Sequence, residues 1–210
     1  VRSRRQRQMC IRDSSYVDRM LASNPDILDV YRVCVPFKVP TCASMFQRYW
    51  RPWEEGKREL WVRAMPAGSY TRGSFPFFSE EMWDYEFQNR FAEWLHRRCG
   101  ATRTCCLIGI RTQESFNRWR TIYSDRNHHR FEGRRWIRQW ADAGICNAYP
   151  IYDWLTTDVW VANGRYHWDY NKLYDLYYRA GVPLDKQRVA SQFISVSYTH
   201  LRAHETVLDL

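Results

Sequence analysis

The chain has 210 residues and carries 32 Lys and Arg against 23 Asp and Glu, a net charge of +9 at pH 7. The chain is therefore moderately basic and lacks the long blocks of like charge that are typical of nucleic-acid-binding arms. Such a charge suits an anionic small ligand as well as RNA or DNA. No apolar run approaches the roughly 20 residues of a membrane helix, so we expect no membrane-spanning segment.

The two ends of the chain carry related coding sequence. Written as codons, residues 9–14 (MCIRDS) are the reverse complement of those that encode residues 195–200 (SVSYTH). The pair resembles the inverted transposon ends of tagmentation sequencing libraries. We therefore expect residues 1–14 and 195–210 to be translated adapter sequence, which is set aside like a tag. The zinc-like spacing of His200 and His204 then has no metal-binding meaning.

The sequence between the ends, residues 15–194, has the length of one domain with a core of its own. A Ser-x-x-Asp cap pattern predicts a first helix over residues 14–21. The β-branched and aromatic run ILDVYRVCVPF predicts a strand over 27–37. From 40 to 78 the pattern dissolves into a Trp-, Pro- and Gly-rich stretch, which favours a binding or lid loop.

Regular patterns resume in the middle of the chain. Ser79, the acidic pair after it and Gly100 predict a helix over residues 79–100. Its apolar face consists of Trp83, Phe87, Phe91, Trp94 and Leu95. The continuous apolar run TCCLIGIR predicts a central parallel strand over 104–111, covered on both faces.

The alternation of strands and helices continues toward the end of the chain. NAYPIYDW predicts a short strand that ends at Asp153, and TTDVWVANG predicts the helix that follows it. Asn171 caps a last predicted helix, which Gly181 and Pro183 terminate. This rhythm favours an open α/β sheet.

Cysteines and histidines predict neither a disulfide framework nor a metal site. The seven cysteines include no Cys-x-x-Cys pair, and Cys105 and Cys106 lie in an apolar run. Buried thiols in a reducing cytoplasm are the better interpretation. His128 and His129 have no third ligand at suitable spacing, so we interpret them as part of a polar loop.

Ligands of open α/β sheets bind at the carboxyl ends of the strands, which directs attention to GIRTQESFNRWR after the predicted central strand. Arginines that converge on a helix N-terminus can hold a phosphate or sulfate group. A solvated, salt-bridged helix start explains the pattern equally well. The candidate binding residues are Gly109, Arg111, Glu114, Ser115 and Arg118.

Three ordered blocks resemble the phosphoadenosine phosphosulfate (PAPS) reductase family. LIGIRTQESFNR is similar to its G-x-R-x-x-x-S-x-x-R segment, and YPIYDWLTTDVW and YNKLYDLYYRAGVP are similar to its later blocks. The combination looks most like a bacterial PAPS reductase-like subgroup with an appended C-terminal domain of unknown function. The resemblance covers residues 15–194.

The resemblance implies a Rossmann-like adenine nucleotide α-hydrolase fold of the PP-loop superfamily, a three-layer α/β/α sandwich with a mostly parallel sheet. It also implies that residues 15–194 begin after the family's second strand, so that this fold is N-terminally truncated and its phosphate loop lies upstream. Gly109, Arg111, Ser115 and Arg118 match the phosphate-side block. Asp153 and Trp154 match the Asp-Trp pair, which organises the sheet end and the next helix.

The implied ligand is ATP or PAPS, with Mg²⁺ as a further candidate cofactor of the intact protein. The implied chemistry is ATP pyrophosphatase-type attack or sulfonate transfer, and we expect residues 15–194 to be inactive on their own. The alternative is an inactive nucleotide-binding regulator that acts with a DNA-binding, ParB-like partner protein.

Two departures bear on reduction of the sulfonucleotide. Thr112 stands where true PAPS reductases carry a second arginine, and no Glu-Cys-Gly segment is found. Cys146 has no basic neighbour in sequence to lower its pKa, so we do not nominate it as a nucleophile.

The tryptophans of the irregular stretch can stack on a base or anchor the loop, and we favour the anchor. They are Trp50, Trp53 and Trp61.

Overall fold

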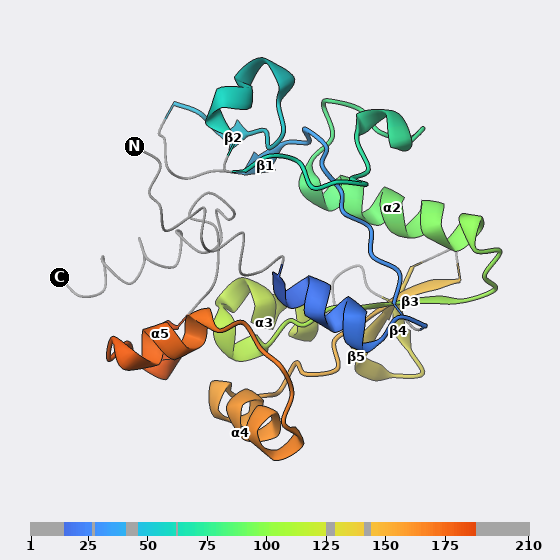
Figure 1. Cartoon of the computed structure of the whole chain (residues 1–210). Coiled ribbons are helices and arrows are strands. Elements are labelled where there is room, and N and C mark those ends of the chain that lie inside the picture. Colours follow the sequence, from blue (N-terminus) through green and yellow to red (C-terminus); the bar gives the residue numbers. More distant parts are fainter. Residues whose placement is uncertain are drawn as a thin grey trace. The chain divides into compact units, whose positions relative to one another are not determined.

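The computed structural model describes residues 15–26, 28–40, 46–61, 63–124, 129–140 and 144–187 (Figure 1). The chain divides into two compact units. The described part of the first unit lies within residues 15–82 and 160–187, and that of the second within residues 83–159. The expected adapter stretches, 1–14 and 195–210, lie outside the described residues, as does His128.

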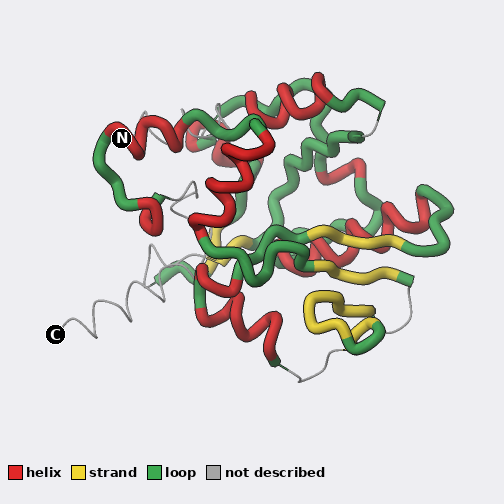
Figure 2. The backbone as a smooth tube through the Cα atoms, turned by 90° about the horizontal axis from the view of Figure 1, so that it is seen from below, coloured by secondary structure: helices red, strands yellow, loops and turns green. Residues whose placement is uncertain are grey.

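The second unit contains a four-stranded sheet, within the part of the chain described. Its spatial order is β3 (Thr104–Leu107), β6 (Ile145–Ala148), β5 (Arg134–Gln139) and β4 (His129–Phe131) (Figure 2). Only β3 and β6 are parallel, whereas β5 runs antiparallel to both of its neighbours. The expected Rossmann-like α/β/α fold with a mostly parallel sheet is therefore wrong for the described residues.

A hairpin explains the difference. Glu132 and Gly133 both have positive φ angles, 49° and 71°, and they form the two-residue turn between β4 and β5. Such a turn matches the twist of antiparallel strands, and glycine adopts it without steric cost. β5 then pairs with the edge of β6 that faces away from β3. The sheet is thus extended by antiparallel pairing and not by a helical crossover between parallel strands.

Strand β3 has one open face. Leu107 is 75% exposed and Cys105 is also exposed, whereas Thr104 and Cys106 are half-buried. The expectation of a strand over 104–111 that is covered on both faces is wrong in its length and its burial. β6 likewise ends at Ala148 and not at Asp153.

Three helices belong wholly or partly to the second unit. The helix expected at 79–100 is present as α2 (Asp84–Arg98), and its residue Phe87 is buried. The expected start was wrong, because Trp83 and not Ser79 is the N-cap. Gly100, with φ of 57°, follows its end as expected. His96 Nδ1 lies 2.7 Å from Thr104 Oγ1, so the end of α2 is tied to the start of β3. The other two helices are α3 (Phe116–Tyr123) and α4 (Thr156–Tyr166).

The first unit contains the irregular stretch. The strand expected at 27–37 is wrong for its described part, where an isolated bridge between Val33 and Tyr70 is the pairing seen. Cys34 and Val35 are nonetheless buried, so the apolar run forms core without a ladder. The remainder consists of a short antiparallel pair, β1 (Val39–Pro40) and β2 (Tyr49–Trp50), and 3-10 helices at Glu55–Leu60 and Arg72–Ser74.

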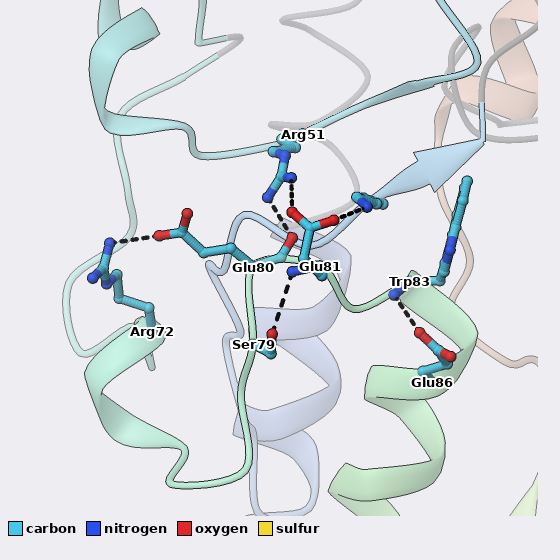
Figure 3. A network of polar contacts seen from close by, with 8 residues as sticks. Arg51, Arg72, Ser79, Glu80, Glu81, Trp83 and Glu86 are labelled. Atoms are coloured by element: carbon cyan, nitrogen blue, oxygen red, sulfur yellow. Dashed lines mark hydrogen bonds and ion pairs between the residues drawn. The ribbon is translucent and has the colours of Figure 1, made fainter.

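Acidic residues at the end of the irregular stretch hold it by ion pairs (Figure 3). Glu81 is bound by Lys38 and, at 3.2 Å, by Arg51. Glu80 pairs with Arg72 at 2.8 Å. Lys38 and Arg51 hold the pKa of the Glu81 carboxyl below its usual range. Because Glu81 is largely exposed, solvent screens these pairs and each contributes little to the stability of the fold.

Helices complete the first unit. The first expected helix is present over 15–23, where Arg19 pairs with Asp169 at 2.6 Å. In α5 (Leu173–Arg179) the expected cap is confirmed, because Asn171 Oδ1 accepts a hydrogen bond from the Leu173 N–H at 3.0 Å. Among the described residues, no helix has both the length and the apolar character needed to cross a membrane.

Candidate functional site

Two loops of the second unit meet at the carboxyl ends of the parallel strands β3 and β6. The Thr112 N–H donates to the Tyr152 carbonyl at 2.8 Å, and the Ile108 N–H donates to the Ala148 carbonyl at 2.9 Å. These bonds hold residues 108–115, which follow β3, beside residues 149–155, which follow β6. The predicted binding segment therefore lies at the strand ends, where ligands of parallel strands bind.

Arg111 joins the two loops. Its side chain is only 15% exposed, and its Nη2 lies 3.1 Å from Glu114 Oε1. Its Nη1 donates to Thr156 Oγ1, at the start of α4, at 3.2 Å. The guanidinium group is thereby fixed between the first turn of α4 and the 3-10 turn Thr112–Glu114.

Glu114 binds both arginines of the predicted site. Its carboxylate is 18% exposed, and it forms ion pairs with Arg111 and with Arg118, whose side chain is 48% exposed. The cluster thus combines two positive charges with one internal counter-ion. The salt-bridged helix start of the sequence pattern is therefore present, and the three side chains together carry a net charge of +1.

Ser115 begins α3. Its Oγ accepts a hydrogen bond from the Arg118 N–H at 3.2 Å, so the hydroxyl caps the helix. The positive end of the α3 dipole therefore faces the Arg111–Glu114–Arg118 cluster, which adds to its attraction for an anion.

Gln113 is a site residue that sequence reasoning missed. Its Oε1 accepts hydrogen bonds from the Thr156 N–H at 2.9 Å and from Arg111 Nη1 at 3.4 Å. It therefore caps α4 from the other loop and orients the guanidinium group as well. Its partner Thr156 is distant in sequence, so no local spacing could reveal the contact.

The other predicted residues, Gly109, Asp153 and Trp154, lie in the same two loops but outside the Arg111–Glu114–Arg118 cluster. Gly109 is exposed, and a Cβ placed there would meet only Ile151 Cδ1, at 4.0 Å, so the space above its backbone is open. Asp153 is exposed in the second loop, and the Trp154 N–H donates to the Ile151 carbonyl at 3.1 Å. Besides Gln113, Asp158 caps the start of α4, since its Oδ2 accepts from the Leu155 N–H at 2.8 Å.

Two cysteines of the sheet, Cys106 and Cys146, are poor nucleophiles. Partial burial, together with a hydrogen bond to Cys105, raises the pKa of the Cys146 thiol to about 11. Burial also raises the pKa of Cys106. These thiols stay protonated near neutral pH, so neither Cys106 nor Cys146 is suited to act as a nucleophile. Across the described ranges, no three His, Cys, Asp or Glu residues are grouped so as to hold a metal ion.

The tryptophans of the irregular stretch pack on each other. Trp53 and Trp61 meet edge to face with ring centroids 5.2 Å apart. Trp61 Nε1 also donates to the Glu54 carbonyl at 3.1 Å. These contacts support the interpretation that the aromatic rings anchor the loop.

Comparison with known proteins identifies a relative without a described activity. The chain is 31% identical over 181 residues to the uncharacterized protein YbdN of Escherichia coli (strain K12). The aligned residues make up 85% of this chain and 43% of YbdN, so the chain spans less than half the length of this relative. No protein-family model matches the chain, and no solved structure matches it.

Proposed function

We propose that the Arg111–Glu114–Arg118 cluster binds the anionic group of an adenine nucleotide or sulfonucleotide, ATP or PAPS, in a PAPS reductase-like protein. The free cysteines and the moderate charge suit a cytoplasmic setting for this protein. The resemblance of three sequence blocks supplies the ligand class, and the geometry of the cluster supports the anion.

The position of Arg111 is the observation that carries the proposal. A largely buried guanidinium group stands at the carboxyl ends of two adjacent parallel strands and beside the start of a helix. Arginine is rarely buried without a role, and its planar fork suits the oxygens of phosphate and sulfate. Glu114 keeps this guanidinium group in place, and an incoming anion can replace part of the contact between the two side chains.

The chemistry that fits such a site is transfer at a phosphoryl or sulfonyl group. Arg111 and Arg118 would stabilise the negative charge that develops on the leaving group, whether pyrophosphate is released from ATP or the sulfonate of PAPS is transferred. Mg²⁺ would neutralise further phosphate charge in the intact protein. The acceptor would enter from the open side above Gly109.

A nucleotide-binding regulator is the second candidate. Thr112 in place of a second arginine and the high pKa of Cys146 both favour binding without turnover. Such a protein would report the nucleotide to a DNA-binding, ParB-like partner instead of converting it.

Calorimetric titration with a panel of ligands tests the proposal. The panel contains ATP, GTP, adenosine 3′,5′-bisphosphate as a stable stand-in for PAPS, and inorganic sulfate. We expect the adenine nucleotides to bind at least tenfold more tightly than sulfate, and GTP more weakly than ATP. Equal weak binding of all four, or no binding at millimolar concentration, would exclude an adenine nucleotide site. Release of pyrophosphate by the longer parent protein separates the enzyme from the regulator.

A further inference from the structure

Helix α3 carries three aromatic rings in a stack, of which two are exposed and the third, Tyr123, is half-buried. The ring centroids of Phe116 and Trp119 lie 5.8 Å apart with planes 13° from parallel, and those of Trp119 and Tyr123 lie 5.0 Å apart at 12°. Phe116 is 62% exposed and Trp119 is 44% exposed. Their spacing by three and four residues places the rings on one side of the helix.

The opposite side of α3 already anchors the helix. Ile122 is fully buried. Arg138 of β5, itself buried, donates to the carbonyls of Thr121 at 3.3 Å and Ser124 at 3.2 Å, and also to that of Ile122. The helix is thus held to the sheet by its C-terminal carbonyls, and Phe116 and Trp119, nearer its start, stay exposed.

Positive charge accompanies the stacked rings. The Arg135 guanidinium carbon lies 4.7 Å from the centre of the Tyr123 ring. Arg120 is exposed and, four residues after Phe116, lies on the same side of α3. No acidic residue occurs within α3 to offset these charges. We call Phe116, Trp119, Arg120, Tyr123 and Arg135 the α3 aromatic surface.

We propose that the α3 aromatic surface binds single-stranded nucleic acid. Bases stack on the exposed rings, and Arg120 and Arg135 contact the phosphates. Aromatic side chains offer this contact to any base, because every base has a π face, and flanking arginines supply the attraction to the backbone. The parallel rings, with two arginines beside them, favour a single strand over a protein partner. The surface is distinct from the Arg111–Glu114–Arg118 cluster, and it does not depend on the proposed nucleotide.

Fluorescence anisotropy with a labelled 12-residue oligothymidylate tests the proposal on the full chain. We expect binding at low salt that weakens as salt rises. Trp119→Ala should weaken it about tenfold, because a base loses the aromatic ring on which it stacks. Trp119→Phe should retain most of the affinity. Arg120→Gln and Arg135→Gln should each reduce the slope of log affinity against log salt by about 0.7.

Trp168→Ala is the matched control. Trp168 is 52% exposed and stacks on Tyr166 with ring centroids 5.2 Å apart, in a different part of the chain. Its loss should leave oligonucleotide binding unchanged. Equal effects of Trp119→Ala and Trp168→Ala would overturn the proposal, as would the absence of binding at low salt. A concentration-dependent dimer that Trp119→Ala abolishes, without any binding of oligonucleotide, would also overturn the proposal.

The nucleotide site is separated from this surface by two further measurements. Arg111→Ala should keep oligonucleotide affinity within twofold, and adenosine 3′,5′-bisphosphate should not displace the oligonucleotide. Displacement by the bisphosphate would show that the oligonucleotide occupies the Arg111–Glu114–Arg118 cluster and would overturn the assignment to α3. Near-ultraviolet circular dichroism of each variant confirms that its fold is retained.

Discussion

Arg111 Nη1 donates to Thr156 Oγ1 across 3.2 Å, although the two residues belong to different loops of the second unit. Each loop follows one of the two parallel strands, β3 and β6. The contact therefore fixes the separation of the loops at the place where an anion would enter. It also orients the guanidinium group before any ligand binds, which reduces the entropy lost on binding.

Gln113 supports the contact between Arg111 and Thr156, and its replacement should lower both the stability of the fold and the affinity for an anion. Gln113→Ala removes the acceptor of the Thr156 N–H, which lies 2.9 Å away. We expect the free energy of unfolding to fall by about 1 kcal/mol and the affinity for a bound anion to fall severalfold. Urea denaturation and calorimetry measure the two effects. Gln88→Ala, on an exposed position of α2, should change neither; equal effects of the two variants would contradict the role of Gln113.

Glu114 is predicted to stabilise the fold and to compete with the ligand. Glu114→Gln removes the charge that Arg111 and Arg118 share, so the free energy of unfolding should fall by about 1–3 kcal/mol. The affinity for an anion should rise, because the cluster loses its only negative charge. Titration with adenosine 3′,5′-bisphosphate measures this rise.

Glu93 provides the matched control for that substitution. It also bridges two arginines, Arg90 at 3.2 Å and Arg97 at 3.3 Å, on α2, and both of these arginines are exposed. Glu93→Gln should cost less than about 1 kcal/mol and leave anion binding unchanged. A loss of anion affinity in Glu114→Gln alone would show that Glu114 positions the arginines without competing.

The open face of β3 gives a prediction about packing. Leu107→Thr should change the free energy of unfolding by less than about 0.5 kcal/mol, since the side chain is 75% exposed. Ile145→Ala, in the adjacent strand, should cost about 2–5 kcal/mol because Ile145 is fully buried. Chemical denaturation compares the two. A cost above about 2 kcal/mol for Leu107→Thr would show that this face is covered in solution.

The pKa of Cys146 predicts slow alkylation. Only the thiolate reacts, and a pKa of about 11 leaves few thiolates at pH 8. Cys146 should react with iodoacetamide on the order of a hundredfold more slowly than a thiol of ordinary pKa. Its rate should rise with pH until about pH 11. Peptide mass spectrometry, with the exposed Cys99 as internal reference, measures the rates. Comparable labelling of the two at pH 8 would refute the burial of the Cys146 thiol.

The helices were predictable from sequence because their signals are local. The apolar face and terminal glycine of α2, and the asparagine cap of α5, each lie within a few turns of chain. The approximate start of α4 followed from its Thr and Asp residues in the same way.

The sheet was not predictable in the same way, because pairing depends on distant partners. The apolar run at 27–37 predicts a strand, yet its described part lacks a ladder beyond the bridge at Val33. The polar hairpin of β4 and β5 was overlooked since its residues are charged, although Gly133 after Glu132 is a usable turn signal.

The sequence predicted which residues gather at the end of β3, and their binding of a ligand stays a prediction. Arg111, Glu114, Ser115 and Arg118 form one contiguous group at the end of β3. Gln113 and Thr156 could not be found, because their contact spans 43 positions of sequence. Hydrogen bonds between loops depend on the register of β3 and β6, which spacing within either loop does not reveal.

The affinity of the chain for adenosine 3′,5′-bisphosphate, measured by calorimetry for the parent sequence and for Arg111→Ala, tests the central claim most directly. Arg103→Ala is the control, since it removes an exposed arginine from the opposite end of β3. We predict that Arg111→Ala weakens binding at least tenfold while Arg103→Ala changes it less than twofold. Equal affinities of the two variants would contradict the assignment of Arg111 as the anion-binding residue.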